Sequence, residues 1–156
     1  MKKLLIILGI IFLCIAMVII AMSLVGAYYG PKLDKSSKAY VDEVVPIILS
    51  SWNPQELTHR AHSEFLKSLP NGEPVIFFRK LSESLGAFKA YKGAVGESHM
   101  NFSFVQGGLK IGINATYIVR AAFQKDDAEI KIDLNQGQDG QWKITGFFVR
   151  LLMVAT

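Results

Sequence analysis

An unbroken apolar run from Leu4 to Ala27 constrains this chain more than any other feature of its sequence. The run carries no charge and a single hydroxyl, that of Ser23. As a helix rising about 1.5 Å per residue it would reach roughly 36 Å, which exceeds the roughly 30 Å of a hydrocarbon core. The sequence therefore predicts a membrane-spanning anchor in residues 1–30, followed by a tethered domain.

Two other interpretations of this segment compete with an anchor. A cleaved signal peptide could be cut after residues 25–27, but its apolar region spans only about 7–15 residues. A lipoprotein needs small residues before its cysteine, whereas bulky side chains precede Cys14. Tyr28 and Tyr29 stand where interfacial aromatic residues gather at a membrane surface. A spanning anchor fits these observations best.

The orientation of the anchor follows less directly from the charges around it. Lys2 and Lys3 precede the apolar run, and Lys32, Lys35 and Lys38 follow it closely, so the positive-inside rule is nearly balanced. A three-residue tail before an apolar run is typical of export signals. We therefore predict a single span in a bacterial inner membrane with the domain on the periplasmic side, and the opposite orientation stays open.

The composition excludes several kinds of partner and chemistry. The net charge is +4, and outside Lys2 and Lys3 the basic and acidic residues are nearly balanced, which argues against nucleic acid as a partner. Cys14 is the one cysteine, so the tethered domain has no disulfide or thiolate chemistry. This usage fits a bacterial envelope and a cytosol equally well.

The first part of the tethered domain has helical patterning. We predict a polar linker in residues 31–37 and one compact domain in residues 38–156. Apolar steps of three and four predict a helix over 37–52, which Pro46 must kink or split. A second helix, capped by Asn53 with a proline at its first position, is predicted to run to Leu69. A third is predicted to begin near Pro74.

The second part changes to the two-residue period of strands. Strands are predicted at 99–106, 110–124, 128–135 and 141–152, with glycines preceding the first of them. Three helices followed by about four antiparallel strands define an α+β domain, with helices packed on one face of a bent sheet. Such a sheet can enclose a cone-shaped hollow.

Several stretches of the tethered domain resemble a known group of proteins. They are DKSSKAYVDEVVPIILSSWNPQELTHRAHSEFLKSL, LGAFKAYKGAVGES and DGQWKITGFFV. They resemble small bacterial envelope proteins with an N-terminal membrane segment and a domain of unknown function, over residues 33–151. That domain is similar to the nuclear transport factor two/ketosteroid isomerase superfamily, also called cystatin-like. The resemblance implies a cone-like α+β fold, which serves enzymes, binding modules and assembly domains alike.

Three residues are candidates for the lining of a ligand pocket. His62 lies three residues after His59, a metal-ligand spacing, but without further ligands a packed histidine is the simpler interpretation. Tyr117 is either a core residue or a hydrogen-bond donor in the hollow. Arg120 interrupts an apolar strand and needs a partner, for which Glu129 or Asp133 would serve, unless it forms the polar wall of a pocket.

Three functional hypotheses follow from these observations. No phosphate loop, Cys-x-x-Cys, nucleophile elbow or His-Glu-x-x-His occurs, so we predict no catalytic residue, cofactor or metal site. The favoured hypothesis is a non-enzymatic, membrane-anchored module that binds a protein partner or a hydrophobic ligand. A small cofactor-free lyase or isomerase using the hollow is the alternative. The third hypothesis is a structural role in a membrane complex or oligomer.

Overall fold

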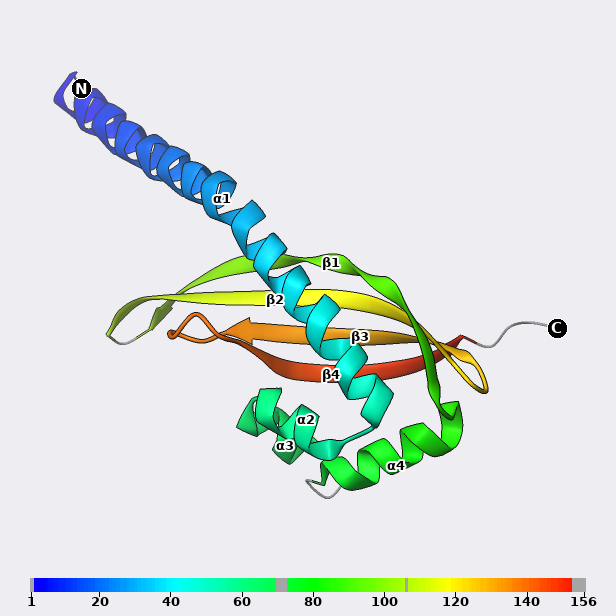
Figure 1. The fold of residues 1–156 in the computed structure, drawn as a ribbon. Coiled ribbons are helices and arrows are strands. Elements are labelled where there is room, and N and C mark those ends of the chain that lie inside the picture. Colours follow the sequence, from blue (N-terminus) through cyan, green and yellow to red (C-terminus); the bar gives the residue numbers. More distant parts are fainter. Residues whose placement is uncertain (1, 70–72, 106, 153–156) are drawn as a thin grey trace. The chain divides into compact units, whose positions relative to one another are not determined.

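The computed structural model describes residues 2–69, 73–105 and 107–152 of the chain (Figure 1). It divides into two compact units, Met1–Leu33 and Asp34–Thr156. The first unit is one stretch of helix. The second holds the rest of the helices and the whole sheet, and it confirms the predicted α+β class.

Helix α1 (Lys2–Ser51) contains the apolar run, and it is long and apolar enough to cross a membrane. The large apolar side chains from Ile6 to Val25 are exposed, as a lipid-facing helix requires. The hydroxyl of Ser23 donates to the carbonyl oxygen of Ile19 at 2.9 Å, so this polar group is satisfied within the helix. Beyond the run, the ammonium group of Lys32 lies 3.9 Å from the ring centre of Tyr28.

The structure differs from the predicted linker, and of the two outcomes predicted at Pro46, a kink or a split, it excludes the split. Residues 31–37 belong to α1, which also continues through Pro46 without splitting. A proline inside a helix removes one backbone hydrogen bond. Around Pro46 this loss is offset by burial, because Val44, Val45, Ile48 and Leu49 are each at most 5% exposed.

The predicted second helix is instead two short helices, α2 (Pro54–Arg60) and α3 (Ser63–Ser68). The cap is as predicted, since the side-chain oxygen of Asn53 accepts from the backbone N–H of Gln55 at 3.0 Å. The break comes where Ala61 forms an isolated bridge with Ile144 of the sheet. The periodicity was misleading because this tertiary backbone pairing overrides the local helical pattern.

Helix α4 (Pro74–Leu85) leads into an antiparallel sheet of β1 (Phe88–Val105), β2 (Gly108–Phe123), β3 (Asp127–Gln136) and β4 (Trp142–Leu152). The strand order is β1-β2-β3-β4, and the sheet is not closed. Strand β1 begins at Phe88 rather than near His99. Its early part was missed because a register shift between Tyr91 and Ala94, with Gly93 at φ +107°, interrupts the two-residue pattern.

The core lies on the sheet face that Figure 1 shows crossed by the second half of α1. We call this the inner face. Inner-facing side chains from each of the last three strands are at most 2% exposed: Tyr117, Val119, Ala121, Ile130, Ile132, Leu134 and Phe147. The indole of Trp52, after α1, stacks on Phe123 with ring centres 5.5 Å apart. The space where a hollow was expected is thus filled by side chains.

Candidate functional site

Tyr117, the first of the three predicted residues, is a core residue that ties β2 to α1. It is 1% exposed, and its hydroxyl lies 2.8 Å from the hydroxyl oxygen of Ser37. It also donates to the carbonyl oxygen of Asp34 at 3.2 Å. Burial raises the pKa of this phenol, so the residue stays neutral at ordinary pH. These contacts support a structural role rather than a pocket lining.

Gly96 makes room for Tyr117 on the neighbouring strand. The two residues are register partners in the β1–β2 pair. A Cβ atom on Gly96 would lie 2.0 Å from the carbonyl oxygen of Thr116 and 2.7 Å from the Cα of Tyr117. Only a glycine therefore fits opposite this tyrosine.

Arg120 projects from the opposite side of β2, which we call the outer face. Three positions separate it from Tyr117, and an odd step along a strand reverses the side. Its Nε donates to Glu129 on β3 at 3.1 Å, so the structure contains one of the two partners that were predicted, Glu129 and Asp133. Arg150 of β4 donates to the other oxygen of the same carboxylate. The hydrogen bond from Arg150, with that from Arg120, holds the pKa of Glu129 below its ordinary value.

His62 lies on neither face of the sheet. It precedes α3, where its ring Nδ1 faces the backbone N–H of Glu64 at 3.4 Å. Its own backbone N–H donates to the carbonyl oxygen of Ile144 at 2.8 Å. His62, Tyr117 and Arg120 therefore occupy three separate places. Among the described residues no group of three metal-ligating side chains could hold an ion.

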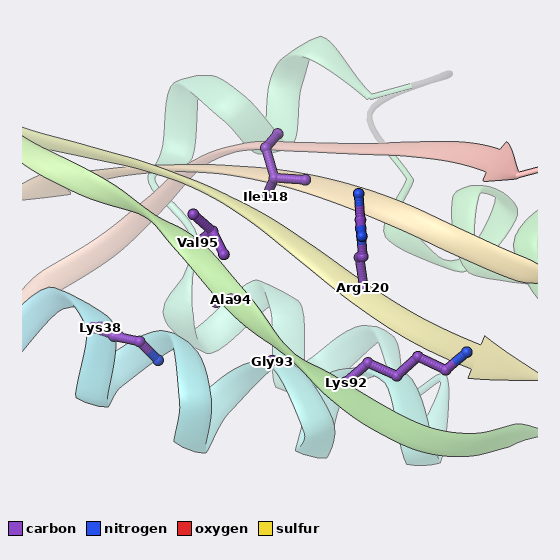
Figure 2. Close-up of a pocket in the computed structure, with 7 residues that line it drawn as sticks. All are labelled: Lys38, Lys92, Gly93, Ala94, Val95, Ile118 and Arg120. Atoms are coloured by element: carbon purple, nitrogen blue, oxygen red, sulfur yellow. The ribbon is translucent and has the colours of Figure 1, made fainter.

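A groove runs along the outer face and around the β1 edge of the sheet, where Lys38 of α1 also lines it (Figure 2). Its volume is about 510 Å³, and it is lined by Lys38, Lys92, Gly93, Ala94, Val95, Ile118 and Arg120. Val95 and Ile118 are register partners and give the groove an apolar floor, with Val95 80% exposed. Figure 2 shows the lysines at its ends and Arg120 beyond Ile118.

A second groove adjoins the first on the outer face, because Ile118 lines both. It has a volume of about 250 Å³ and continues across β3 and β4, where it is lined by Ile118, Glu129, Lys131, Phe148, Val149 and Arg150. Phe148 is 58% exposed, and the ammonium group of Lys131 lies 5.7 Å from its ring centre. The two grooves form a shallow apolar strip with charged borders.

The charges along this strip are mostly paired. Lys38 lies 2.7 Å from Asp42, Lys92 lies 2.5 Å from Asp127, and Lys131 lies 3.1 Å from Asp133. The exception is the trio in which Arg120 and Arg150 share the single carboxylate of Glu129. This trio carries a net positive charge, and its guanidinium groups are largely exposed. It can therefore accept a further carboxylate from a partner.

A tyrosine–carboxylate pair next to Lys38, which lines the first groove, was not predicted from the sequence. The hydroxyl of Tyr91 donates to the Oδ1 of Asp42 at 2.6 Å. Burial and the hydrogen bond to Asp42 both raise the pKa of Tyr91. Burial raises the pKa of Asp42, but hydrogen bonds from Lys38 and Tyr91 outweigh it and lower the value. The i, i+4 spacing of Lys38 and Asp42 was the available signal.

This pair does not meet the requirements of the enzymatic alternative. A lyase or isomerase of that kind needs an ionisable pair that converges in a dry cavity. The side chain of Asp42 is 40% exposed, and its carboxylate is already bound to Lys38. The groove beside it is open to solvent.

Comparison of the chain with protein-family models, with curated protein sequences and with solved structures gave no match. The class of protein is therefore defined by the fold alone. It is an α+β domain with an open four-stranded antiparallel sheet, carried by a chain whose N-terminal helix is able to span a membrane.

Proposed function

We propose that this protein is a membrane-anchored, non-enzymatic binding module whose outer sheet face docks a protein partner. The observation that carries the proposal is the continuous strip formed by the two grooves, with Val95, Ile118 and Phe148 exposed along it. Exposed apolar residues that form one strip, rather than being scattered, are typical of interaction surfaces.

The borders of the strip indicate the chemistry of the partner. Arg120 and Arg150 share one carboxylate and retain donors that point to solvent. Guanidinium groups bind carboxylates with directed, charge-assisted hydrogen bonds. A partner segment with a carboxylate next to an apolar side chain would satisfy both the strip and the trio. A small hydrophobic ligand fits less well, because the inner face is filled and the outer grooves are open.

The place of the module in the cell is part of the same proposal. The domain is held at a bacterial inner membrane by a single span, with the sheet on the periplasmic side. The length and composition of α1 support the span. Similarity to the nuclear transport factor two/ketosteroid isomerase superfamily remains a proposal that the order of helices and strands supports.

Site-specific photocrosslinking in cells tests the partner surface. A photoreactive phenylalanine analogue replaces Phe148 on the strip or, as the matched control, Thr58 on the exposed side of α2. We expect a defined crosslinked protein at position 148 and none at position 58. Charge reversal of both arginines, Arg120→Glu with Arg150→Glu, should abolish the crosslink while the domain stays folded. Equal crosslinking at both positions, or a crosslink that survives the reversal, contradicts the proposal.

A further inference from the structure

A second exposed apolar surface lies on the hairpin formed by the ends of β1 and β2. The β2–β3 pairing stops at Ile113, so residues 101–105 and 108–112 form a two-stranded arm, and no third strand pairs with it among the residues that the structure describes. The arm extends past the turn between β3 and β4 (Figure 1). Two-stranded ribbons are marginally stable in water unless one face is covered.

The arm is amphipathic, and its apolar side continues the inner face. The apolar side carries Phe102, Leu109 and Ile111, which are 41%, 48% and 58% exposed. Phe102 and Ile111 are register partners, so they stand together on one side. Asn101 and Lys110 project from the other side. The apolar side of the arm is therefore a different surface from the proposed partner strip, which lies on the outer face.

The position of the arm along the domain points to what covers its apolar side. The carboxylate of Asp34 accepts from the backbone N–H and the hydroxyl of Ser98, both at 2.6 Å, and Asp42 contacts Tyr91. Within this unit, β1 and α1 therefore run in opposite directions. The arm continues from Ser98 past the point where the chain enters the domain at Asp34.

The covalent chain limits how far that entry point can be from the membrane. Ala27, the end of the apolar run, and Asp34 are seven peptide steps apart along the chain. Even fully extended, these steps span at most about 25 Å. The arm from Ser98 to Val105 has a similar length, about 24 Å at roughly 3.4 Å per residue. It is therefore long enough to reach the surface of the bilayer that anchors the chain.

The charge of the arm favours a lipid surface over a basic partner. No aspartate or glutamate occurs from Ser98 to Lys125, and Lys110 is the charged residue next to the exposed apolar side chains. Lys32 and Lys35 add positive charge at the entry of the chain into the domain. Basic groups beside apolar ones are attracted to membranes that contain anionic headgroups.

From these observations we infer that the β1–β2 arm inserts Phe102, Leu109 and Ile111 into the interfacial region of the anchoring membrane. The arm gives the domain a second membrane contact besides the span. This contact fixes which side of the domain faces the lipid and leaves the outer face available. It does not depend on the partner proposed for that face.

Spin labelling of the full-length protein in nanodiscs tests the inference. The background carries Cys14→Ser, and single cysteines replace Leu109 on the arm or Gln138 in the neighbouring turn between β3 and β4. The discs contain phosphatidylcholine and phosphatidylglycerol. Collision of the label with oxygen, which concentrates in lipid, is compared with collision with a water-soluble nickel chelate. We expect a severalfold higher oxygen-to-nickel ratio at position 109 than at position 138.

Two results would overturn the inference. Equal ratios at both positions mean that the arm stays in water. Low access for both reagents at position 109, with spin–spin broadening between labels, means that a second copy covers the arm instead of lipid. Discs without phosphatidylglycerol separate the apolar attraction of the arm from the electrostatic attraction of the lysines. In these discs the oxygen-to-nickel ratio at position 109 should fall if the lysines contribute. It should still stay above the ratio at position 138. Circular dichroism verifies that each labelled protein is folded.

Discussion

The two faces of β2 lie in opposite environments although their residues alternate along one strand. On the inner face, Tyr117, Val119 and Ala121 are buried under α1 and have almost no contact with solvent. On the outer face, Ile118 and Arg120 line open grooves beside an ion-paired cluster. The comparison teaches that the residues of the core and those of the proposed partner surface are separated by strand parity in this domain. Substitutions one residue apart should therefore affect different properties.

The largest contrast is expected between two isoleucines on opposite faces. Ile132 is fully buried on the inner face, and Ile118 is 38% exposed on the outer face. Ile132→Ala should lower the free energy of unfolding by about 3 kcal/mol, because it removes buried methylenes and leaves a cavity. Ile118→Ala should change it by less than about 1 kcal/mol. Urea unfolding followed by circular dichroism measures both, and equal losses would remove the distinction between the faces.

The next effect concerns the contact between β1 and Tyr117. Gly96→Ala should destabilise the domain by about 2–3 kcal/mol, because the added Cβ forces the two strands apart. Gly112→Ala is the control on the adjacent strand, where the nearest atom to an added Cβ is the Asn101 carbonyl oxygen at 3.9 Å. The control should fold with nearly unchanged stability. Thermal unfolding of the two variants under the same conditions makes the comparison.

A smaller effect is expected when only the hydroxyl of Tyr117 is removed. Tyr117→Phe keeps the ring in the core but loses the contacts with Ser37 and Asp34, which should cost about 1 kcal/mol. Hydrogen exchange should locate the loss in β2 and in the part of α1 that follows Asp34. Unchanged exchange there would indicate that ring packing alone holds this helix on the inner face.

The smallest effect is a pH dependence on the outer face. The pKa of Glu129 is lowered in the folded protein, chiefly by Arg150, so the ionised form stabilises the fold. This stabilisation is present above the unfolded value of about 4.3 and is lost as the pH falls through the folded pKa. Glu129→Gln should therefore be less stable than wild type above about pH 5, and the difference should vanish in strong acid.

A double-mutant comparison isolates this pH effect. In a background with Arg120→Gln and Arg150→Gln, the further change Glu129→Gln should no longer alter the acid part of the stability curve. If the acid dependence persists in that background, groups other than this trio cause it.

The sequence predicted the class of fold because its main signals are local. The apolar run, the Asn53 cap and the alternation in β3 each depend on neighbours within a few residues. The break at Ala61 and the early start of β1 depend on Ile144 and on the bulge at Gly93, which are tertiary features. No pattern of period 2 or 3.6 within a single segment records them.

The sequence allowed a charged pair of the candidate site to be predicted, but not the way in which that pair joins further residues. Arg120 was expected to bind Glu129 or Asp133 because a charge in an apolar strand needs a partner, and the structure contains the pair with Glu129. The sharing of Glu129 with Arg150 depends on the β3–β4 register, which the sequence leaves open. His62, Tyr117 and Arg120 were considered together only because each was unusual in its segment.

The bulge at Gly93 also bears on the open edges of the sheet. Strands β1 and β4 each have one neighbour in the sheet, so each exposes a row of backbone groups to which another chain could add a strand. Near Ile144 the edge of β4 is occupied by Ala61 and His62. In the first half of β1, the positive φ of Gly93 interrupts the row. The bulge that lines the first groove therefore also interrupts the edge to which another strand could add.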